Sequence, residues 1–268
     1  MTDTPTLPPA AASRLAASAR PEGRRLFTSD LTVNEFALVR ECGFTPLAMV
    51  MGSVMYHIGL EPQRPRGSQE LEGLTHAMVE ARDLAVHRME TEADALGADG
   101  VLGVRLDMFS HAGAGDVMEF VATGTAVKSS AGGSWRTAKG RPFTSDLSGQ
   151  DFWTVVRTGH MPISLVLGVC VYHIAHQAER QAIATVGPNA ELPSYTAVVF
   201  DGREKAMGRM QQDAESLRAD GVIGVRAVTS SHIWGEHAVE FLAAGTAVRS
   251  FPLDASLPSP TLVLAASP

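Results

Sequence analysis

Hydrophobic and polar residues follow the same succession of patterns twice along the chain. Each half has a short amphipathic segment, an apolar run, a long segment with near-helical apolar spacing and two shorter strand-like segments. The apolar runs, 47–55 and 163–171, are typical of strands covered on both faces. The long segments, 70–96 and 193–217, favour helices. The pattern predicts an α+β fold of two tandem repeats, each a short helix, a strand, a long helix and a two-stranded hairpin.

Identical short segments show that the two halves are copies of one unit. The sequence Phe-Thr-Ser-Asp-Leu at 27–31 returns at 143–147, and Tyr-His-Ile at 56–58 returns at 172–174, both 116 positions later. Segments nearer the end, such as Ala-Asp-Gly-Val at 98–101, return 121 positions later, at 219–222. Five residues are therefore inserted in one loop of the second copy. A period of this length excludes solenoid repeats, which have about 20 to 50 residues.

These displacements define the domain organisation that we expect. Repeat 1 covers 27–128 and repeat 2 covers 143–250, and the glycine-containing segment 129–142 links them. The flanking segments 1–26 and 251–268 are predicted to be disordered tails. The short Leu-Val-Leu patch at 262–264 suits either a docking peptide for a protein partner or a plain tail, and we favour the plain tail.

Capping signals place the first helix of each repeat. Thr32 and Glu35 have the spacing of a capping box, and Gly43 lies where a left-handed residue ends a helix. In repeat 2, Ser148, Asp151 and Gly159 occupy the same places.

The last two strands of each repeat are expected to form a hairpin. Centring the first hairpin on residue 112 pairs Leu102 with Ala122 and Arg105 with Glu119. The second hairpin then pairs Arg226 with Glu240. Such pairs are either surface ion pairs worth about 0 to 1 kcal/mol or charged groups at a subunit contact. We favour the interface reading for Arg105, Glu119, Arg226 and Glu240.

A repeat of three strands and one long helix is thin. Its apolar first strand has no obvious second cover within the repeat, so burying that strand needs another repeat, from the same chain or from another.

Composition narrows the classes of function. The net charge of −7 and the isoelectric point near 5.7 argue against nucleic acid as a partner. No apolar run approaches the roughly 20 residues that cross a bilayer, and no signal peptide is apparent, so we expect no membrane partner. Cys42 and Cys170 lie at non-equivalent positions of the two repeats. Unpaired cysteines favour a reducing, cytoplasmic location.

The end of each repeat resembles the YbjQ-like family. The resemblance rests on Ala-Leu-Gly-Ala-Asp-Gly-Val-Leu-Gly-Val-Arg at 95–105 with Glu-Phe-Val-Ala-Thr-Gly-Thr-Ala-Val at 119–127, and on the matching pattern from 216 to 248. It implies small α+β subunits, a YbjQ-like or dodecin-like sheet with one long helix, which close into pentameric rings. The family also carries a heavy-metal-binding label. The opening helix, the Tyr-His-Ile segment and Arg218 in place of a turn glycine depart from the family pattern.

Two pairs of histidines match between the repeats and are the candidate metal ligands. His57 matches His173 at the end of the apolar strand, and His111 matches His232 at the hairpin tip. For each pair, a structural or solvated histidine is the simpler reading. A transition metal is the one cofactor class that these residues suit, and the sequence does not define which metal.

Other residue types offer little chemistry. Neither cysteine is duplicated, so buried thiols are the expected role. Methionines such as Met51, Met55 and Met78 are expected to fill cores. No nucleophile with a base and no phosphate-binding loop is evident, so we expect no enzyme. Asp99 and Asp220 are expected to turn the chain from the long helix into the next strand.

We therefore expect a non-enzymatic, oligomer-forming scaffold or binding protein, and the alternative is a metal-binding or metal-responsive protein. A homo-oligomeric ring is the expected assembly. Whole two-repeat chains cannot tile a ring of five repeats, because five is odd. Either five chains form two stacked rings, or the ring has an even number of repeats.

Overall fold

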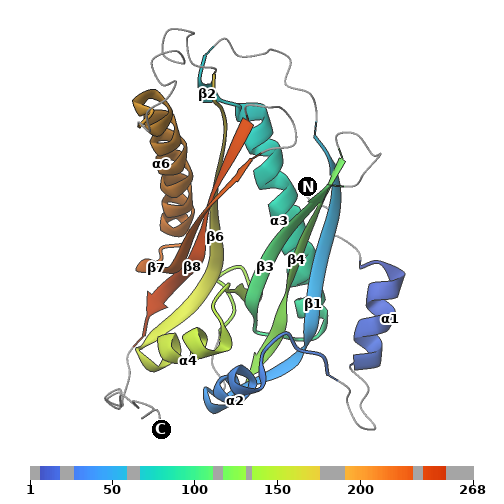
Figure 1. Cartoon of the computed structure of the whole chain (residues 1–268). Coiled ribbons are helices and arrows are strands. Elements are labelled where there is room, and N and C mark those ends of the chain that lie inside the picture. The colour runs from blue at the N-terminus through green and yellow to red at the C-terminus, as the bar shows by residue number, and fades with distance from the viewer. Residues whose placement is uncertain are drawn as a thin grey trace, which may run out of the picture.

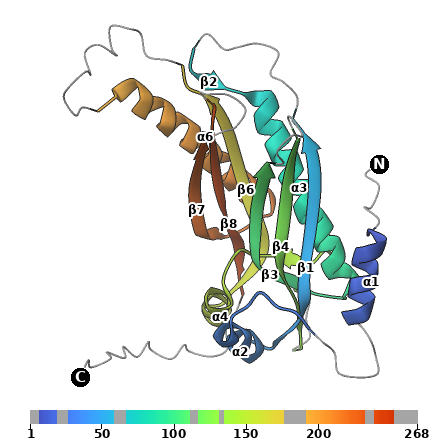
Figure 2. The same cartoon turned by 45° about the vertical axis from the view of Figure 1, so that its right-hand side comes forward.

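The computed structural model describes residues 7–18, 27–58, 67–110, 117–130, 135–175, 191–231 and 238–251. It contains two similar α+β units that lie side by side, each with a sheet and a long helix packed on it (Figures 1 and 2). The expected fold class is confirmed.

The predicted elements occur in the predicted order in both repeats, and each repeat also has a two-residue strand, β2 or β5, that was not predicted. Repeat 1 contains α2 (Val33–Glu41), β1 (Phe44–His57), β2 (Gln69–Glu70), α3 (Glu72–Ala95), β3 (Gly100–Ser110) and β4 (Val117–Ser129). Repeat 2 contains β5 (Phe143–Thr144), α4 (Gly149–Arg157), β6 (His160–His173), α6 (Pro193–Ser216), β7 (Gly221–Ser231) and β8 (Ala238–Ser250).

The two repeats exchange short strands. One sheet has the order β1-β4-β3-β5, and the other has the order β2-β6-β8-β7. Strand β5 belongs to repeat 2 but pairs in parallel with β3 of repeat 1, and β2 of repeat 1 pairs with β6 of repeat 2. Each repeat therefore extends the sheet of the other.

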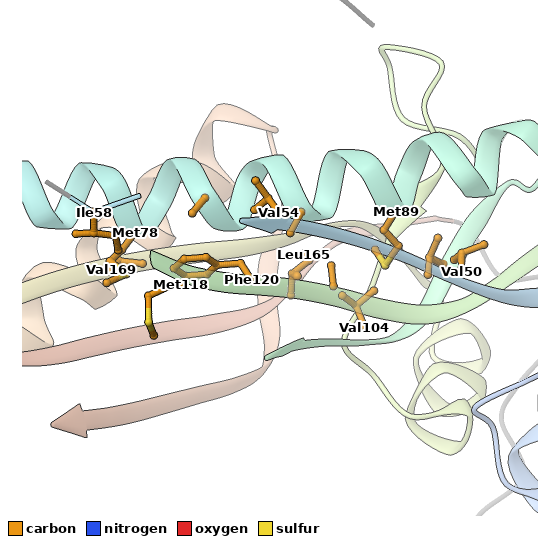
Figure 3. Packing of buried hydrophobic residues seen from close by; sticks show 14 of the residues in the cluster. Val50, Val54, Ile58, Met78, Met89, Val104, Met118, Phe120, Leu165 and Val169 are labelled. Atoms are coloured by element: carbon orange, nitrogen blue, oxygen red, sulfur yellow. The ribbon is translucent and has the colours of Figure 1, made fainter. Parts of the chain in front are cut away.

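One hydrophobic core crosses the boundary between the repeats. Val54, Met78 and Phe120 of repeat 1 pack in the same cluster as Leu165 and Val169 of β6 (Figure 3). The opposite face of β6 packs under α6 in a second cluster that includes Val166 and Met210. Strand β6 is thus covered on both faces, as its apolar sequence predicts.

The helix caps form as the sequence predicts. The Thr32 side chain accepts a hydrogen bond from the Glu35 amide, and the Glu35 carboxylate accepts one from the Thr32 amide, which completes the capping box. Gly43 has a φ of 80°, in the left-handed region that suits glycine after a helix. Arg218 takes the same conformation with a φ of 56° at the position where repeat 1 has Gly97.

Glycines let each long helix lie close to its first strand. A Cβ atom at Gly52 would lie 2.1 Å from the Ala85 carbonyl oxygen, and one at Gly168 would lie 1.9 Å from the Ala206 carbonyl oxygen. Any side chain at either position would push helix and strand apart.

The predicted hairpin register is wrong. Leu102 lies opposite Thr125 rather than Ala122, and Arg105 lies opposite Thr123 rather than Glu119. In repeat 2, Arg226 lies opposite Ala244 rather than Glu240. Both hairpins contain a register shift next to a glycine, between Leu102 and Arg105 in repeat 1. Beyond the register shift, Arg105 is displaced by four residues from its predicted partner, and alternation cannot detect this because a slip by an even number of residues leaves the face of the strand unchanged.

Part of the predicted N-terminal tail is helical. Helix α1 (Pro9–Ser18) packs beside β1 and α3 (Figure 2), with Leu15 buried and Arg14 paired with Glu92. The expectation of disorder over 1–26 is therefore wrong for these residues. Their sequence starts with a proline and contains five alanines, which suits a helix that has a surface to pack on. The segment 252–268, with its Leu-Val-Leu patch, lies outside the described residues.

No helix in the described part of the chain has both the length and the hydropathy that crossing a membrane requires.

Candidate functional site

The contact between the repeats begins with a strand added to an edge. Phe143 and Thr144 pair with Gly100 and Val101, and the Ser145 amide donates to the Val101 carbonyl at 2.9 Å. Beyond the pair, the amides of Gly103 and Val104 donate to the carbonyls of Leu147 and Ser145 at 3.1 and 2.9 Å. The register shift in β3 thus turns two amides outward, and the segment 143–147 accepts from both.

Contacts within repeat 2 fix the conformation of the segment 143–147. The Thr246 hydroxyl lies 3.0 Å from the Ser145 hydroxyl and accepts from the Asp146 amide at 3.1 Å. The Asp146 carboxylate accepts from Arg226 at 2.9 Å. Phe143 stacks on Phe152 of α4. The side chains of the segment are therefore bound to its own repeat, while its backbone groups form hydrogen bonds with β3 of repeat 1.

A second backbone contact lies at the other end of the same interface. Gln69 and Glu70 pair with His173 and Tyr172, and the Leu71 amide donates to the Val171 carbonyl at 2.8 Å. The Thr75 hydroxyl of α3 accepts from the Val171 amide at 2.9 Å. These hydrogen bonds fix the position of α3 along β6.

A buried ion pair lies beside the second backbone contact, because Glu240 is opposite Val171 on the neighbouring strand. Arg82 of α3 forms an ion pair with Glu240 of β8, with a guanidinium nitrogen 2.7 Å from a carboxylate oxygen, and the two side chains are 6% and 2% exposed. The guanidinium also lies over the Phe120 ring, 5.5 Å from its centroid. A buried charge is tolerated only with a partner, and these two charges are paired only when the repeats pack in this arrangement. The ion pair therefore favours this arrangement over others.

A second ion pair joins the repeats nearer the surface. Arg209 of α6 contacts Glu70 at 2.7 Å and donates to the Val169 carbonyl at 2.6 Å. Burial favours the neutral carboxyl, but the hydrogen bond and charge of Arg209 outweigh it and lower the pKa of Glu70.

A cavity of about 590 Å³ lies over β6 between α3 and α6. Its walls combine apolar groups from β6 with charged and polar groups from the two helices, among them His76, Arg82, Asp83, Arg209 and Asp213. Desolvation, followed by the negative charges of Asp213, Glu90 and Glu80, raises the pKa of Asp83 from 3.8 to about 6.

Replacing Asp83 with asparagine is expected to raise the melting temperature at about pH 7.5 and to leave it unchanged at about pH 4. Because the folded state raises the Asp83 pKa, ionisation opposes folding, and stability is lost as the pH rises from about 4 to about 6. Thermal unfolding at both pH values measures the effect, with Glu215→Gln on the exposed side of α6 as the control. An equal gain at both pH values would show that ionisation of Asp83 is not the cause.

Comparison with known proteins identifies the family. The model of the family described as "Putative heavy-metal-binding" (YbjQ) matches residues 48–130 and 164–250, more than half of the chain and one segment in each repeat. The chain belongs to the YbjQ-like family. It is also 46% identical over 245 residues to the encapsulin nanocompartment protein Rv1762c of Mycobacterium tuberculosis, covering 91% of this chain and 92% of that protein.

Shorter relatives match one part of the chain. A UPF0145 protein of Halorubrum lacusprofundi is 52% identical over 59 residues, 22% of this chain and 55% of that protein. The UPF0145 protein TTHA1944 of Thermus thermophilus is 47% identical over 62 residues, 23% of this chain and 53% of that protein.

The predicted interface residues of this YbjQ-like chain form different pairs. Arg105 pairs with Asp30 and Arg226 with Asp146, so both arginines anchor the Phe-Thr-Ser-Asp-Leu segments of their own repeats. Glu240 lies at the repeat contact with Arg82. Glu119, its counterpart, lies on β4 opposite Met55 of β1. The cross-strand pairs Arg105–Glu119 and Arg226–Glu240 are therefore wrong.

Sequence reasoning missed the residues that join the repeats. Glu70, Thr75, Arg82 and Arg209 received no role, although each has an identical counterpart in the other repeat: Glu191, Thr196, Arg203 and Arg88. Identity between the copies was the available signal.

The candidate metal ligands do not form a cluster in the described residues. His57 is exposed at the end of β1, and the ring of His173 lies 3.3 Å from the Gly67 carbonyl oxygen. His111 and His232 lie outside the described residues. No group of three or more histidine, cysteine or acidic side chains suited to a metal occurs in the part of the chain that is described.

The remaining candidate residues have structural roles. Cys42 and Cys170 are free thiols, and burial raises the pKa of each to about 11. The carboxylates of Asp99 and Asp220 accept from the amides of Ser129 and Ser250, which supports their predicted role in turning the chain.

Proposed function

We propose that the chain is a non-enzymatic structural protein that assembles with further copies of itself. One observation carries the proposal: β6 of repeat 2 is covered on both faces, whereas the equivalent strand β1 of repeat 1 exposes Met51 by 46% and Met55 by 55%. Their counterparts Leu167 and Val171 are half-buried and fully buried against repeat 1. The expectation that these methionines fill a core is wrong for the single chain, and a second copy would supply the cover.

The printed name of the Mycobacterium tuberculosis relative, an encapsulin nanocompartment protein, supports a structural role for this chain. We further propose that the assembly is a closed ring, as the family resemblance implies for pentameric members. The repeats lie edge to edge in the chain, which favours a ring with an even number of repeats over two stacked rings of five. Five chains in such a ring would contribute ten repeats. The two free cysteines favour the cytoplasm as its location.

Native mass spectrometry of the full chain tests the proposal of self-assembly. At micromolar concentrations of the protein we expect one discrete species that contains several chains. A closed ring should keep this mass when the protein is diluted. A mass of a single chain at every concentration would contradict it.

Metal binding by His57, His173, His111 and His232 is the second candidate function, and the description of the matching family model favours it. Titration of the full chain with zinc, copper or nickel tests it against the His57→Ala, His173→Ala variant. Stoichiometric binding that the variant loses would support the role, and binding that the variant keeps would contradict it for this pair.

A further inference from the structure

We infer that the two outer faces of the chain bind each other, head to tail, through a copy of the contact that joins the two repeats. This inference rests on the proposed self-assembly and names the surfaces and the partner, a second copy of this chain. In it, the segment Phe27–Leu31 of one chain adds to the free edge of β7 of the next.

The segment 27–31 already has the shape of its counterpart 143–147. The Thr125 hydroxyl lies 3.3 Å from the Ser29 hydroxyl and accepts from the Asp30 amide at 3.1 Å. The Leu31 amide donates to the Ser29 hydroxyl at 3.1 Å, as the Leu147 amide donates to the Ser145 hydroxyl at 3.2 Å. Asp30 pairs with Arg105 as Asp146 pairs with Arg226. The strand is therefore preorganised for pairing, which reduces the entropy that binding would lose.

The strand that would receive this segment is at an edge. Strand β7 is the last in its sheet among the described residues, whereas its counterpart β3 is flanked by β5. β7 has the same register shift as β3, and Gly224 has a φ of 65° where Gly103 has 63°. The two amides that β3 turns toward the segment 143–147 correspond to those of Gly224 and Val225. An unpaired edge of this kind is a template for another strand.

Exposure of side chains differs between the repeats at these positions. Val104 is 2% exposed, but its counterpart Val225 is 42% exposed, and Phe143 is fully buried where Phe27 is 48% exposed. Phe200 of α6 is 58% exposed, and its counterpart Val79 lines the cavity beside β6. Val225 and Phe200 lie on the face with β7 and α6, and Phe27, Met51 and Met55 lie on the face with β1. Each outer face thus offers apolar groups that the other can cover.

The charges on the two outer faces are complementary. Arg203 of α6 lies over the Phe241 ring of its own repeat, as Arg82 lies over Phe120. The counterpart of Glu240, the partner of Arg82, is Glu119 on the opposite outer face. In the same way, Glu191 and Arg88 correspond to the pair formed by Glu70 and Arg209. The Arg88 guanidinium already donates to the Ser53 carbonyl, as Arg209 donates to that of Val169.

Two details differ from the contact within the chain. Gly149 approaches Glu35 closely, and a Cβ there would lie 2.6 Å from the Glu35 Cβ, but the counterpart of Gly149 is Val33. Helices α2 and α4 therefore pack less closely between chains than within one. The second difference is helix α1, which contacts β1 through a hydrogen bond from Arg14 to the Met49 carbonyl oxygen. This contact is at the opposite end of β1 from Glu119, which lies beside Met55.

A contact that joins unlike faces is heterologous, so copies add in one direction until a ring closes or a filament grows. Every chain then supplies one segment 27–31 and one β7 edge. In a closed ring, both outer faces of every chain contact a neighbouring chain.

Val225→Asp in the full chain tests the inference, with Val228→Asp as the matched control. Val228 is 48% exposed on the same strand, and its counterpart Asp107 is an exposed carboxylate outside the repeat contact. We expect Val225→Asp to raise the dissociation constant of assembly by about 100-fold or more, because an unpaired carboxylate would be buried. Val228→Asp should assemble like the unmodified chain, and both variants should unfold at similar temperatures as monomers.

Charge reversal gives an independent readout by native mass spectrometry. Arg203→Glu and Glu119→Arg are each expected to weaken assembly by about 10-fold or more, and the double variant is expected to restore it, since each contact again joins opposite charges. If the unmodified chain assembles and Val225→Asp assembles equally well, or if the double variant is no better than the single ones, this inference is wrong while self-assembly stands. If the unmodified chain never assembles, both are wrong.

Discussion

Replacing Glu240 with alanine is expected to lower the free energy of unfolding by about 3 to 5 kcal/mol. The change leaves the guanidinium of Arg82 buried, at 6% exposure, without its partner carboxylate. The protein must then either keep an uncompensated buried charge or open the contact between the repeats. Urea unfolding at a fixed protein concentration measures the loss, because assembly makes stability depend on concentration.

Two variants separate this charge effect from a loss of packing. Glu215→Ala, on the exposed side of α6, should change stability by no more than about 0.5 kcal/mol. The double replacement Arg82→Met, Glu240→Leu should recover most of the loss, because it removes both charges and keeps the volume apolar. A double variant as unstable as Glu240→Ala would indicate that the ion pair is not what the single replacement disrupts.

Replacing Gly168 with valine is expected to cost about 3 kcal/mol or more. A Cβ atom there would lie 1.9 Å from the Ala206 carbonyl oxygen and 2.5 Å from the Met210 amide nitrogen, both in the backbone of α6. Backbone atoms cannot rotate away, so the helix must move off β6 and the core that includes Val166 and Met210 must open.

Gly208→Ala, on the helix α6 that packs against Gly168, is the matched control. Apart from the neighbouring backbone of its own helix, no heavy atom of the described residues lies within 4 Å of a Cβ at Gly208, and alanine favours a helix interior over glycine by about 1 kcal/mol. Thermal or urea unfolding should therefore show a gain for Gly208→Ala and a large loss for Gly168→Val. A loss of less than about 1 kcal/mol for Gly168→Val would contradict the close approach of α6 to β6.

The sequence predicts the order of elements well because the signals for them are local. The capping box at Thr32 and Glu35, the left-handed glycines and the long apolar helix faces each act over a few residues. The register of the hairpins was not predictable in this way. Arg105 lies opposite Thr123 rather than Glu119, and both pairings place the same side chains on the same face.

The pairs at the site depend on contacts between distant parts of the sequence. Arg105 pairs with Asp30 and Arg82 with Glu240, and neither pair follows from the pattern of one strand or helix. The duplication nevertheless carried usable information, because Arg82 and Glu240 each have an identical counterpart in the other repeat. Likewise, apolar β1 and β6 look alike in sequence, and only the fold distinguishes the covered strand from the exposed one.

Hydrogen exchange of the assembled protein, followed by mass spectrometry, tests most directly whether the outer faces bind each other as the repeats do. The informative peptides cover 221–226 in β7 and 100–105 in β3. In the described part of one chain these strands differ, because β3 is flanked by β5 and β7 is at the edge of its sheet. The account predicts that in the assembled protein the amides of Gly224 and Val225 exchange as slowly as those of Gly103 and Val104. Fast exchange of Gly224 and Val225 in a protein that is fully assembled would contradict it.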